Sequence, residues 1–179
     1  MPSWPMAVTI LAPGGTIGML GGGQLGRMTT LAARVMGYRV VVLDPTPNCP
    51  AGQVADRHTV APYDDEQAIA DLGKGTDVVT LEFENLPVAT VRRLAHHLPT
   101  RPGTEVLSIC QDRLAERRFL ARLGIPTASF AAIVDEASRI AAAATVPFPA
   151  LLKTATQGYD SKGQRPVPTA ADLSTAHAQ

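Results

Sequence analysis

A glycine-rich segment, "LGGGQLGRM", contains the first residues whose types and spacing suggest chemistry. Gly21, Gly23 and Gly26 satisfy the pattern G-x-G-x-x-G, in which a tight backbone turn and a helix N-terminus bring N–H groups against an anion. Asp44 ends the next apolar run, where a carboxylate would suit a ribose hydroxyl in a dinucleotide-binding fold. The segment favours a phosphate-bearing ligand, and the alternative is that the glycines only allow close packing of strand and helix.

A second segment, "LLKTATQGYDSKGQ", combines basic residues with glycines. Lys153 lies in an otherwise apolar strand, and a buried ammonium is costly unless an anion or a carboxylate receives it. The loop that follows carries Lys162, and Gly158 and Gly163 would serve as its flexible ends. We expect this hairpin tip to fold over a ligand phosphate. The alternative is a solvated turn in which Lys162 and Asp160 face water.

The apolar pattern predicts the elements that must position the glycine segment. Strands are expected at residues 16–20, 38–44, 57–61 and 76–83, and helices at residues 24–37, 64–75 and 88–98. The first of these helices places a set of apolar residues at helical spacing: Leu25, Met28, Ala32, Val35 and Met36. Strands that alternate with helices predict an α/β fold with a parallel sheet covered on both faces.

The pattern changes in the second part of the chain. A helix around residues 110–123 is expected to end at Gly124 and Pro126, with an apolar face formed by Leu114, Phe119, Leu120 and Leu123. Further on, strands are expected at residues 127–134, 149–155 and 163–168, and helices at residues 135–145 and 170–179. Thr169 and Asp172 form a capping-box-like start for the last helix. This mixture indicates the beginning of a second, α+β unit.

Composition excludes several classes of function. Sixteen basic residues balance sixteen acidic ones, so no positive field would collect nucleic acid. The apolar stretch near the N-terminus is interrupted too early by Pro-Gly-Gly to span a membrane. Cys49 and Cys110 lack the spacing of a metal or disulfide framework and are interpreted as cytosolic thiols. His96 and His97 have no further ligand at metal spacing, so no metal site is predicted within this chain.

Five motifs together carry a family resemblance: "TIGMLGGGQLGRM", "VVVLDPTPNCPAGQVAD", "DVVTLEFENLP", "CQDRLAERRFLARLGIPTASF" and "LLKTATQGYDSKGQ". In this order, from Thr16 to Gln164, they resemble the 5-(carboxyamino)imidazole ribonucleotide synthase family of ATP-grasp ligases in purine biosynthesis. The resemblance implies an N-terminal extension at residues 1–15, a Rossmann-like pre-ATP-grasp domain at 16–110 and a first, incomplete ATP-grasp lobe at 111–179.

The resemblance also implies an activity. The family forms carboxyphosphate from ATP and bicarbonate, transfers the carboxyl group to the exocyclic amine of 5-aminoimidazole ribonucleotide, and releases ADP and phosphate. It implies Mg2+ as a cofactor and a homodimer. Together with the composition, we expect a cytoplasmic location with no nucleic-acid or membrane partner. This loop departs from the family pattern at Gln157 and Ser161, where glycines are usual, and at Ala155, where a basic residue is common.

Site residues follow from the same resemblance, motif by motif, and none of them is assigned as catalytic. The ATP side consists of Arg113, Lys153, Gly158, Tyr159, Asp160, Ser161, Lys162, Gly163 and Gln164. The ribonucleotide side consists of Gly23, Gln24, Leu25, Glu82, Glu84, Tyr159 and Asp160. Positive charge suits the ATP phosphates, and carboxylates suit hydroxyls and an amine.

Two other interpretations stay open. The glycine segment and Asp44 alone would fit a nicotinamide-dinucleotide-binding protein, although this leaves residues 111–164 without a role. The chain would alternatively be a truncated, inactive ligand-binding fragment, because the family's metal-binding residues lie on a second ATP-grasp lobe. On that view we expect the chain alone not to turn over.

Overall fold

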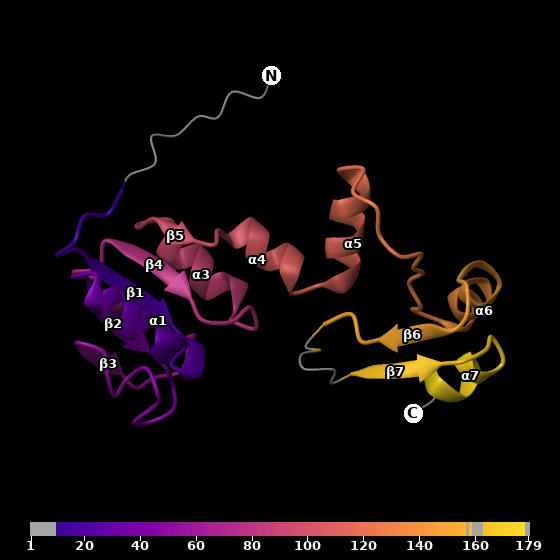
Figure 1. The fold of residues 1–179 in the computed structure, drawn as a ribbon, viewed down its shortest axis with the longest axis horizontal. Helices are drawn as coiled ribbons and strands as arrows, with labels where there is room; N and C mark the ends of the chain where they lie inside the picture. Colours follow the sequence, from indigo (N-terminus) through magenta and orange to yellow (C-terminus); the bar gives the residue numbers. More distant parts are fainter. Residues whose placement is uncertain (1–9, 157, 159–162, 178–179) are drawn as a thin grey trace, which may run out of the picture. The chain divides into compact units, whose positions relative to one another are not determined.

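The structure, a computed structural model, describes residues 10–156, 158 and 163–177 (Figure 1). The chain forms two compact units, Met1–Leu107 and Ser108–Gln179. Each unit has its own sheet, one with five strands and the other with two. Within the described residues, no helix is both long enough and apolar enough to cross a membrane.

The first unit is built on a five-stranded parallel sheet in the order β3-β2-β1-β4-β5. Its strands are β1 (Thr16–Leu20), β2 (Arg39–Leu43), β3 (Arg57–Thr59), β4 (Val78–Leu81) and β5 (Thr100–Arg101). The strand order reverses at β1, which pairs with β2 on one side and with β4 on the other. This topology confirms the predicted α/β, Rossmann-like fold, and it places the switch point of the sheet at the carboxyl ends of β1 and β4.

Two apolar clusters show that both faces of this sheet are covered. Its helices are α1 (Gln24–Val35), α2 (Glu66–Gly73), α3 (Val88–Ala95) and α4 (Thr104–Cys110), the last of which runs across the boundary between the units. Met19 and Val40 pack with Ala33 of α1, whereas Leu20 packs in a second cluster with Leu72 of α2. Adjacent strand residues point to opposite faces, so the period of two along β1 divides the core between the two helix layers.

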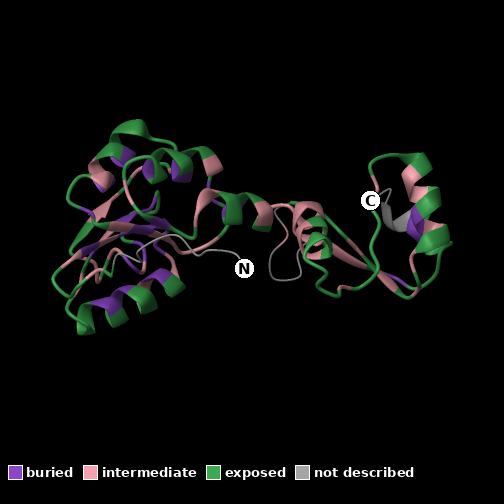
Figure 2. Cartoon of the chain, turned by 90° about the horizontal axis from the view of Figure 1, so that it is seen from above, coloured by how far each residue is buried: buried purple, intermediate pink, exposed green. Residues whose placement is uncertain are grey.

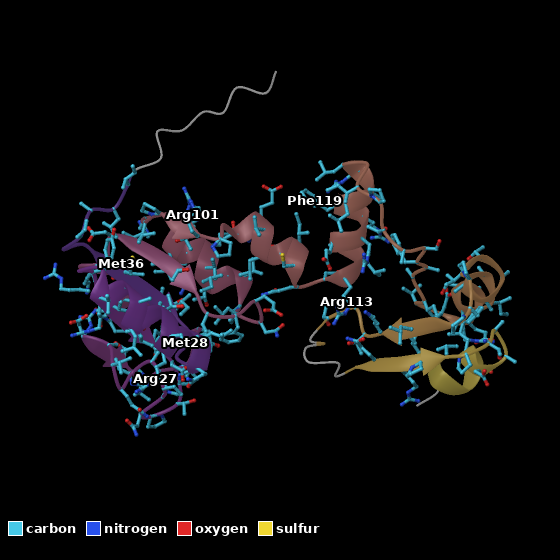
Figure 3. The ribbon with its side chains drawn as sticks, in the orientation of Figure 1. Arg27, Met28, Met36, Arg101, Arg113 and Phe119 are labelled. Carbon is cyan, nitrogen blue, oxygen red and sulfur yellow. The ribbon has the colours of Figure 1, made fainter. Side chains whose placement is uncertain are left out.

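The face that α1 turns to the sheet is not the one that the large apolar residues suggest. Gly26, Thr30 and Ala33 are buried, whereas Leu25, Met28, Val35 and Met36 are exposed. Figure 3 labels Met28 and Met36, and Figure 2 shows the exposed parts of the helices in green. Ala32 is exposed as well. Small residues allow the helix to lie close to the glycine-rich strand end, which is why they occupy the contact instead of the bulky ones.

The second unit contains a helix, a helix-flanked hairpin and a small core. Its elements are α5 (Arg113–Arg122), α6 (Glu136–Thr145), β6 (Ala150–Lys153), β7 (Gln164–Val167) and α7 (Asp172–His177). The strands β6 and β7 pair antiparallel, as the predicted hairpin requires. A buried cluster of Ala142, Val167 and Leu173 joins α6, the hairpin and α7. The Thr169 N–H donates to the Asp172 carboxylate, which is one half of the predicted capping box. The Thr169 hydroxyl donates to the same carboxylate, and the Asp172 N–H donates to the Thr169 carbonyl.

Three predictions about individual elements were wrong or incomplete. Residues 127–134 form no strand, and the described sheet of this unit contains only β6 and β7. Residues that favour strands form one only where a neighbouring strand is available for pairing. The short elements β5 and α4 were not predicted. No residue of α5 is fully buried: Leu114, Phe119 and Leu120 of its predicted apolar face are partly buried, and Leu123 is exposed.

Candidate functional site

The glycine loop lies at the reversal point of the parallel sheet. It directly follows β1, and the segment with Glu82 and Glu84 directly follows β4. Leu20 and Leu81, the last residues of these two neighbouring strands, are register partners. The carboxyl ends of parallel strands meet at one edge, and ligands of open α/β sheets bind in the crevice there. The fold therefore places the glycine segment and the two glutamates of the site prediction at the same edge of the sheet.

Carboxylates, and not a ligand, receive the N–H groups of the glycine loop. The Gly22 N–H donates to Asp44 Oδ2 at 2.7 Å. The Gly23 N–H donates to Glu82 Oε2 at 2.6 Å, and the Gly26 N–H donates to Glu82 Oε1 at 3.2 Å. The expectation that these N–H groups hold a ligand phosphate does not match this arrangement, because two acidic side chains directly after β2 and β4 already accept from them.

Asp44 is fixed by three donors and is only 7% exposed. Besides Gly22, Tyr63 donates its hydroxyl to Oδ2 at 2.8 Å and the Thr46 N–H donates to Oδ1 at 2.7 Å. Burial by itself would raise the pKa of Asp44, but the hydrogen bonds from Thr46, Tyr63 and Gly22 outweigh it and lower the pKa below its ordinary value. A carboxylate with these partners holds the loop together and is not free to receive a ribose hydroxyl, which argues against the dinucleotide interpretation.

Tyr63 is a participant that sequence reasoning missed. Its hydroxyl donates to Asp44, and its ring packs edge-on against Phe83 with centroids 5.9 Å apart. Burial and the adjacent Asp44 carboxylate raise the pKa of this phenol. Tyr63 lies in a loop between β3 and α2 with no motif around it, so no pattern in the sequence could have found it.

The cysteine nearest the loop is an inert thiol. Cys49 is a free cysteine, 2% exposed, and it accepts the Gly52 N–H. Its Sγ lies 3.4 Å from Nε2 of His58. Burial raises the pKa of this thiol, and the nearby Asp44 and Glu82 carboxylates act in the same direction. The side chain therefore packs beside the loop as a small apolar group.

The residues of the first unit that are predicted for the ribonucleotide side differ in their exposure. Gln24 and Leu25, at the first turn of α1, and Glu84 after β4 are exposed, whereas Gly23 and Glu82 are partly buried. Amide and carboxylate groups at this edge can accept and donate hydrogen bonds to hydroxyl and amino groups of a ligand. Glu84 also takes part in an interaction within the protein.

In the second unit, Lys153 is not the buried ammonium that the apolar strand suggested. Along β6 the side chains alternate, so that Leu152 packs on the small core while Leu151 and Lys153 are exposed. The period of two places Lys153 on the face opposite that core. Its ammonium is therefore available to an external anion without a burial cost.

Arg113 is joined to the backbone of the loop that follows β6. Its Nε donates to the Thr154 carbonyl at 3.1 Å and its Nη2 donates to the Gly158 carbonyl at 2.6 Å. Its backbone N–H donates to the Ala155 carbonyl at 2.9 Å. Figure 3 shows Arg113 at the start of α5 beside this loop. The structure thus brings the two predicted ATP-side cations, Arg113 and Lys153, to the same end of the hairpin.

The rest of the loop predicted to cover a phosphate is described only in part. Tyr159, Asp160, Ser161 and Lys162 lie outside the described residues. Gly163 has φ +66°, in the left-handed region that favours glycine, and its carbonyl accepts the Thr154 N–H at 2.9 Å. Gln164 begins β7 opposite Lys153.

Metal ligands do not cluster in the described part of the chain. No group of three or more histidine, cysteine, aspartate and glutamate side chains there could hold a metal ion. The described carboxylates of the first unit that lie closest to the glycine loop, Asp44 and Glu82, instead accept backbone N–H groups.

Comparisons with known sequences agree with this architecture. The family described as "Ribonucleotide synthetase preATP-grasp domain" matches residues 15–111, and the ATP-grasp domain matches residues 118–179. The N5-carboxyaminoimidazole ribonucleotide synthase of Brucella melitensis is 46% identical over 159 residues, which cover 89% of this chain and 44% of the relative. The Pseudomonas aeruginosa enzyme of the same name is 42% identical over 163 residues, which cover 91% and 45%. The chain thus spans less than half the length of these relatives.

Solved structures show the same similarity. The ADP complex of the Staphylococcus aureus N5-carboxyaminoimidazole synthetase matches with a TM-score of 0.88 and 38% identity, over 94% of this chain and 45% of that one. The Aspergillus clavatus N5-carboxyaminoimidazole synthase, in complex with ADP and 5-aminoimidazole ribonucleotide, matches with a TM-score of 0.80 and 28% identity, over 91% and 43%. The parallel sheet with its glycine loop, the hairpin and these matches lead to one conclusion: the chain belongs to the ribonucleotide synthetase pre-ATP-grasp domain family, continues into an ATP-grasp domain, and is similar to N5-carboxyaminoimidazole ribonucleotide synthases.

Proposed function

We propose that this chain contributes the ribonucleotide-binding domain and part of the ATP site of an ATP-dependent ligase that carboxylates 5-aminoimidazole ribonucleotide with bicarbonate. The products would be 5-(carboxyamino)imidazole ribonucleotide, ADP and phosphate. The observation that carries the proposal is the match, over 91% of this chain, to an Aspergillus clavatus enzyme that holds both ADP and 5-aminoimidazole ribonucleotide. The proposal includes the cytoplasmic homodimer that the resemblance implies.

On the ATP side, Lys153 and Arg113 would neutralise phosphate charge. Lys153 is exposed at the end of β6, so its ammonium can meet a phosphate without first leaving a protein partner in the described structure. Such charge neutralisation, together with positioning, is the main contribution of a protein to phosphoryl transfer. The resemblance adds the loop from Gly158 to Gln164, including Tyr159, Asp160, Ser161 and Lys162, as the cover over the phosphates.

On the ribonucleotide side, the exposed Gln24, Leu25 and Glu84 would contact the substrate, with Gly23 and Glu82 behind them. Their common edge at the reversal point of the sheet supports this assignment. A carboxylate can accept from the exocyclic amine and thereby orient the nitrogen that must attack the carboxyl carbon. Tyr159 and Asp160 would join them, according to the resemblance.

Magnesium is the cofactor that the family implies. When bound, it would neutralise the charge on the phosphoryl group that is transferred. The described residues offer no cluster that fits it, so the roles above concern only the groups of this chain.

Binding of each ligand to the purified chain tests the proposal by calorimetry. Lys153→Met should lower the affinity for ADP roughly tenfold to a hundredfold, because methionine keeps the aliphatic stem and loses the charge-assisted contact. The same variant should leave 5-aminoimidazole ribonucleotide binding unchanged, whereas Gln24→Ala and Glu84→Gln should weaken only the ribonucleotide. Lys74→Met, which removes an exposed lysine paired with Asp71, is the matched control.

Two results would contradict the proposal. One is an equal loss of affinity for both ligands in every site variant, which would mean that the variants act on folding and not on separate sites. The other is a larger thermal stabilisation by NAD than by ATP, since a ligand stabilises the protein according to its affinity for the folded state.

A further inference from the structure

Glu82 makes a contact that its assigned place on the ribonucleotide side does not require. Both oxygens of its carboxylate accept from the glycine loop, Oε2 from the Gly23 N–H and Oε1 from the Gly26 N–H, at 2.6 and 3.2 Å. The contact is tight on the loop side as well, because a Cβ at Gly23 would overlap Oε1 and one at Gly21 would lie 2.8 Å from Oε2. The loop is thus shaped around this carboxylate.

The chemistry of the contact is that of an internal anion. The Gly23 and Gly26 N–H groups flank the start of α1, where unpaired N–H groups and the helix dipole favour negative charge. A carboxylate that receives two N–H groups satisfies donors that a phosphate would otherwise satisfy. Its negative charge also repels a second anion at the same place.

The two donors enclose the residues that face the ligand. Gln24 and Leu25 lie between Gly23 and Gly26 in sequence, and both are exposed. Fixing the N–H groups on either side of this dipeptide fixes the backbone on which its side chains are presented. Glu84, two residues further along the chain, is exposed and takes no part in this pair of hydrogen bonds.

We propose that Glu82 is a positioning residue: its carboxylate fills the anion place of the glycine loop, presets Gln24 and Leu25 for the ligand, and closes the Gly23 and Gly26 N–H groups to phosphate. The identity of the ligand rests on the proposed function, whereas the contact itself does not. The two glutamates after β4 therefore have different roles, with Glu82 acting through the loop and Glu84 acting on the ligand.

Amide hydrogen exchange of the purified chain, followed by NMR, tests the contact directly. In Glu82→Ala the Gly23 and Gly26 amides should exchange about tenfold faster or more, as expected when charge-assisted hydrogen bonds are lost. Added formate, a free carboxylate that fits the vacated space, should restore both exchange rates, whereas chloride at the same ionic strength should not. The Val79 amide, bonded to the Pro99 carbonyl within the sheet, reports any general loss of stability.

Two further variants keep the test decisive if Glu82→Ala is poorly folded. Glu82→Gln has the same shape but a single acceptor oxygen, so one of the two glycine amides should exchange faster and formate should have no effect. Glu84→Ala should leave both amides unchanged. Unchanged glycine amides in Glu82→Gln, or a formate-insensitive Glu82→Ala whose Val79 amide is still protected, would overturn the proposal.

Ligand binding separates this inference from the proposed function. Glu82→Ala should weaken 5-aminoimidazole ribonucleotide binding, and formate should recover the affinity, because the anion again presets the loop. Formate should not recover the affinity of Glu84→Ala. If the unmodified chain does not bind the ribonucleotide while formate still restores the glycine amides, the proposed function fails and the role of Glu82 stands. Binding of inorganic pyrophosphate to the Gly23 and Gly26 amides of the unmodified chain would contradict the proposal that Glu82 closes these N–H groups to phosphate.

Discussion

Replacing Asp44 by asparagine should destabilise the first unit strongly while hardly changing the size of the side chain. The Asp44 carboxylate accepts from the Gly22 N–H, the Thr46 N–H and the Tyr63 hydroxyl, at 2.7, 2.7 and 2.8 Å. Two of these donors use Oδ2 and one uses Oδ1. An asparagine has one acceptor oxygen and a donor NH2 group, so it cannot accept hydrogen bonds at both positions that Oδ1 and Oδ2 occupy.

The cost follows from the donors that are left without an acceptor. If the asparagine oxygen replaces Oδ2, the Thr46 N–H faces the NH2 group, and an unsatisfied buried donor costs about 1–3 kcal/mol. The two retained hydrogen bonds lose their charge assistance, about 1 kcal/mol each. Burying a neutral amide in place of a carboxylate offsets part of this loss. We therefore expect the free energy of unfolding to fall by about 2–4 kcal/mol at pH 7.

The effect should depend on pH in a defined direction. The pKa of Asp44 is lowered in the folded protein, so its contribution to stability is complete above the unfolded-state pKa of about 3.9. It is lost as the pH falls through the folded-state pKa. Urea unfolding followed by circular dichroism should accordingly show the largest difference between Asp44→Asn and the unmodified chain near neutral pH, with the difference narrowing below about pH 4.

Asp64→Asn is the matched control, because Asp64 is exposed and the substitution should change stability by less than about 0.5 kcal/mol. Equal stability of Asp44→Asn and Asp64→Asn would refute the reasoning. A difference that is the same at pH 7 and near pH 2 would also refute it, since the Asp44 contribution would then not depend on ionisation.

Three other substitutions test the second unit. Gly163→Ala should destabilise the hairpin by about 1 kcal/mol or more in thermal unfolding. The reason is that φ of Gly163 is +66° and the new Cβ would lie 2.6 Å from Oγ1 of Thr154. Gly103→Ala, with open space around it, should have a smaller effect. Asp112→Ala should lower the free energy of unfolding in urea by about 1 kcal/mol, since the side chain caps α5. Asp112→Asn should retain most of the stability, and equal losses in the two variants would contradict the role of Asp112 as a cap. Arg113→Lys keeps the charge but cannot bridge the two carbonyls of the loop after β6, so the carbonyl 13C shift of Thr154 should change; an unchanged shift would show that the bridge is absent in solution.

Local pattern was enough to predict most of the fold. The alternation of apolar runs with helical spacing gave the parallel sheet, because each β-α-β unit must bury its strand between helices. The hairpin of β6 and β7 followed from two short strands flanking a glycine-containing loop. Residues 127–134 were predicted as a strand and are not one, because pairing depends on a neighbour that sequence preference cannot supply.

The helix α1 shows where pattern misleads. Leu25, Met28, Val35 and Met36 have the spacing of a buried face, but Gly26, Thr30 and Ala33 make the contact with the sheet. Hydrophobic spacing reports which residues share a side of a helix, and it does not report how closely the helix must approach the strand. Lys153 is the parallel case in β6, where the alternation puts the lysine on the exposed face.

The sequence by itself determined which residues are candidates for ligand binding: the order of the motifs indicated the glycine loop and the two glutamates after β4 in the first unit, and Arg113 and Lys153 in the second. Only the tertiary structure decided what each group contacts. Hydrogen bonds from Gly22 to Asp44 and from Gly23 to Glu82 join residues 22 and 59 positions apart. Such contacts depend on the register of neighbouring parallel strands, which a one-dimensional pattern does not contain. For that reason the glycine N–H groups, which the motif alone offers to a phosphate, are held by carboxylates of the protein.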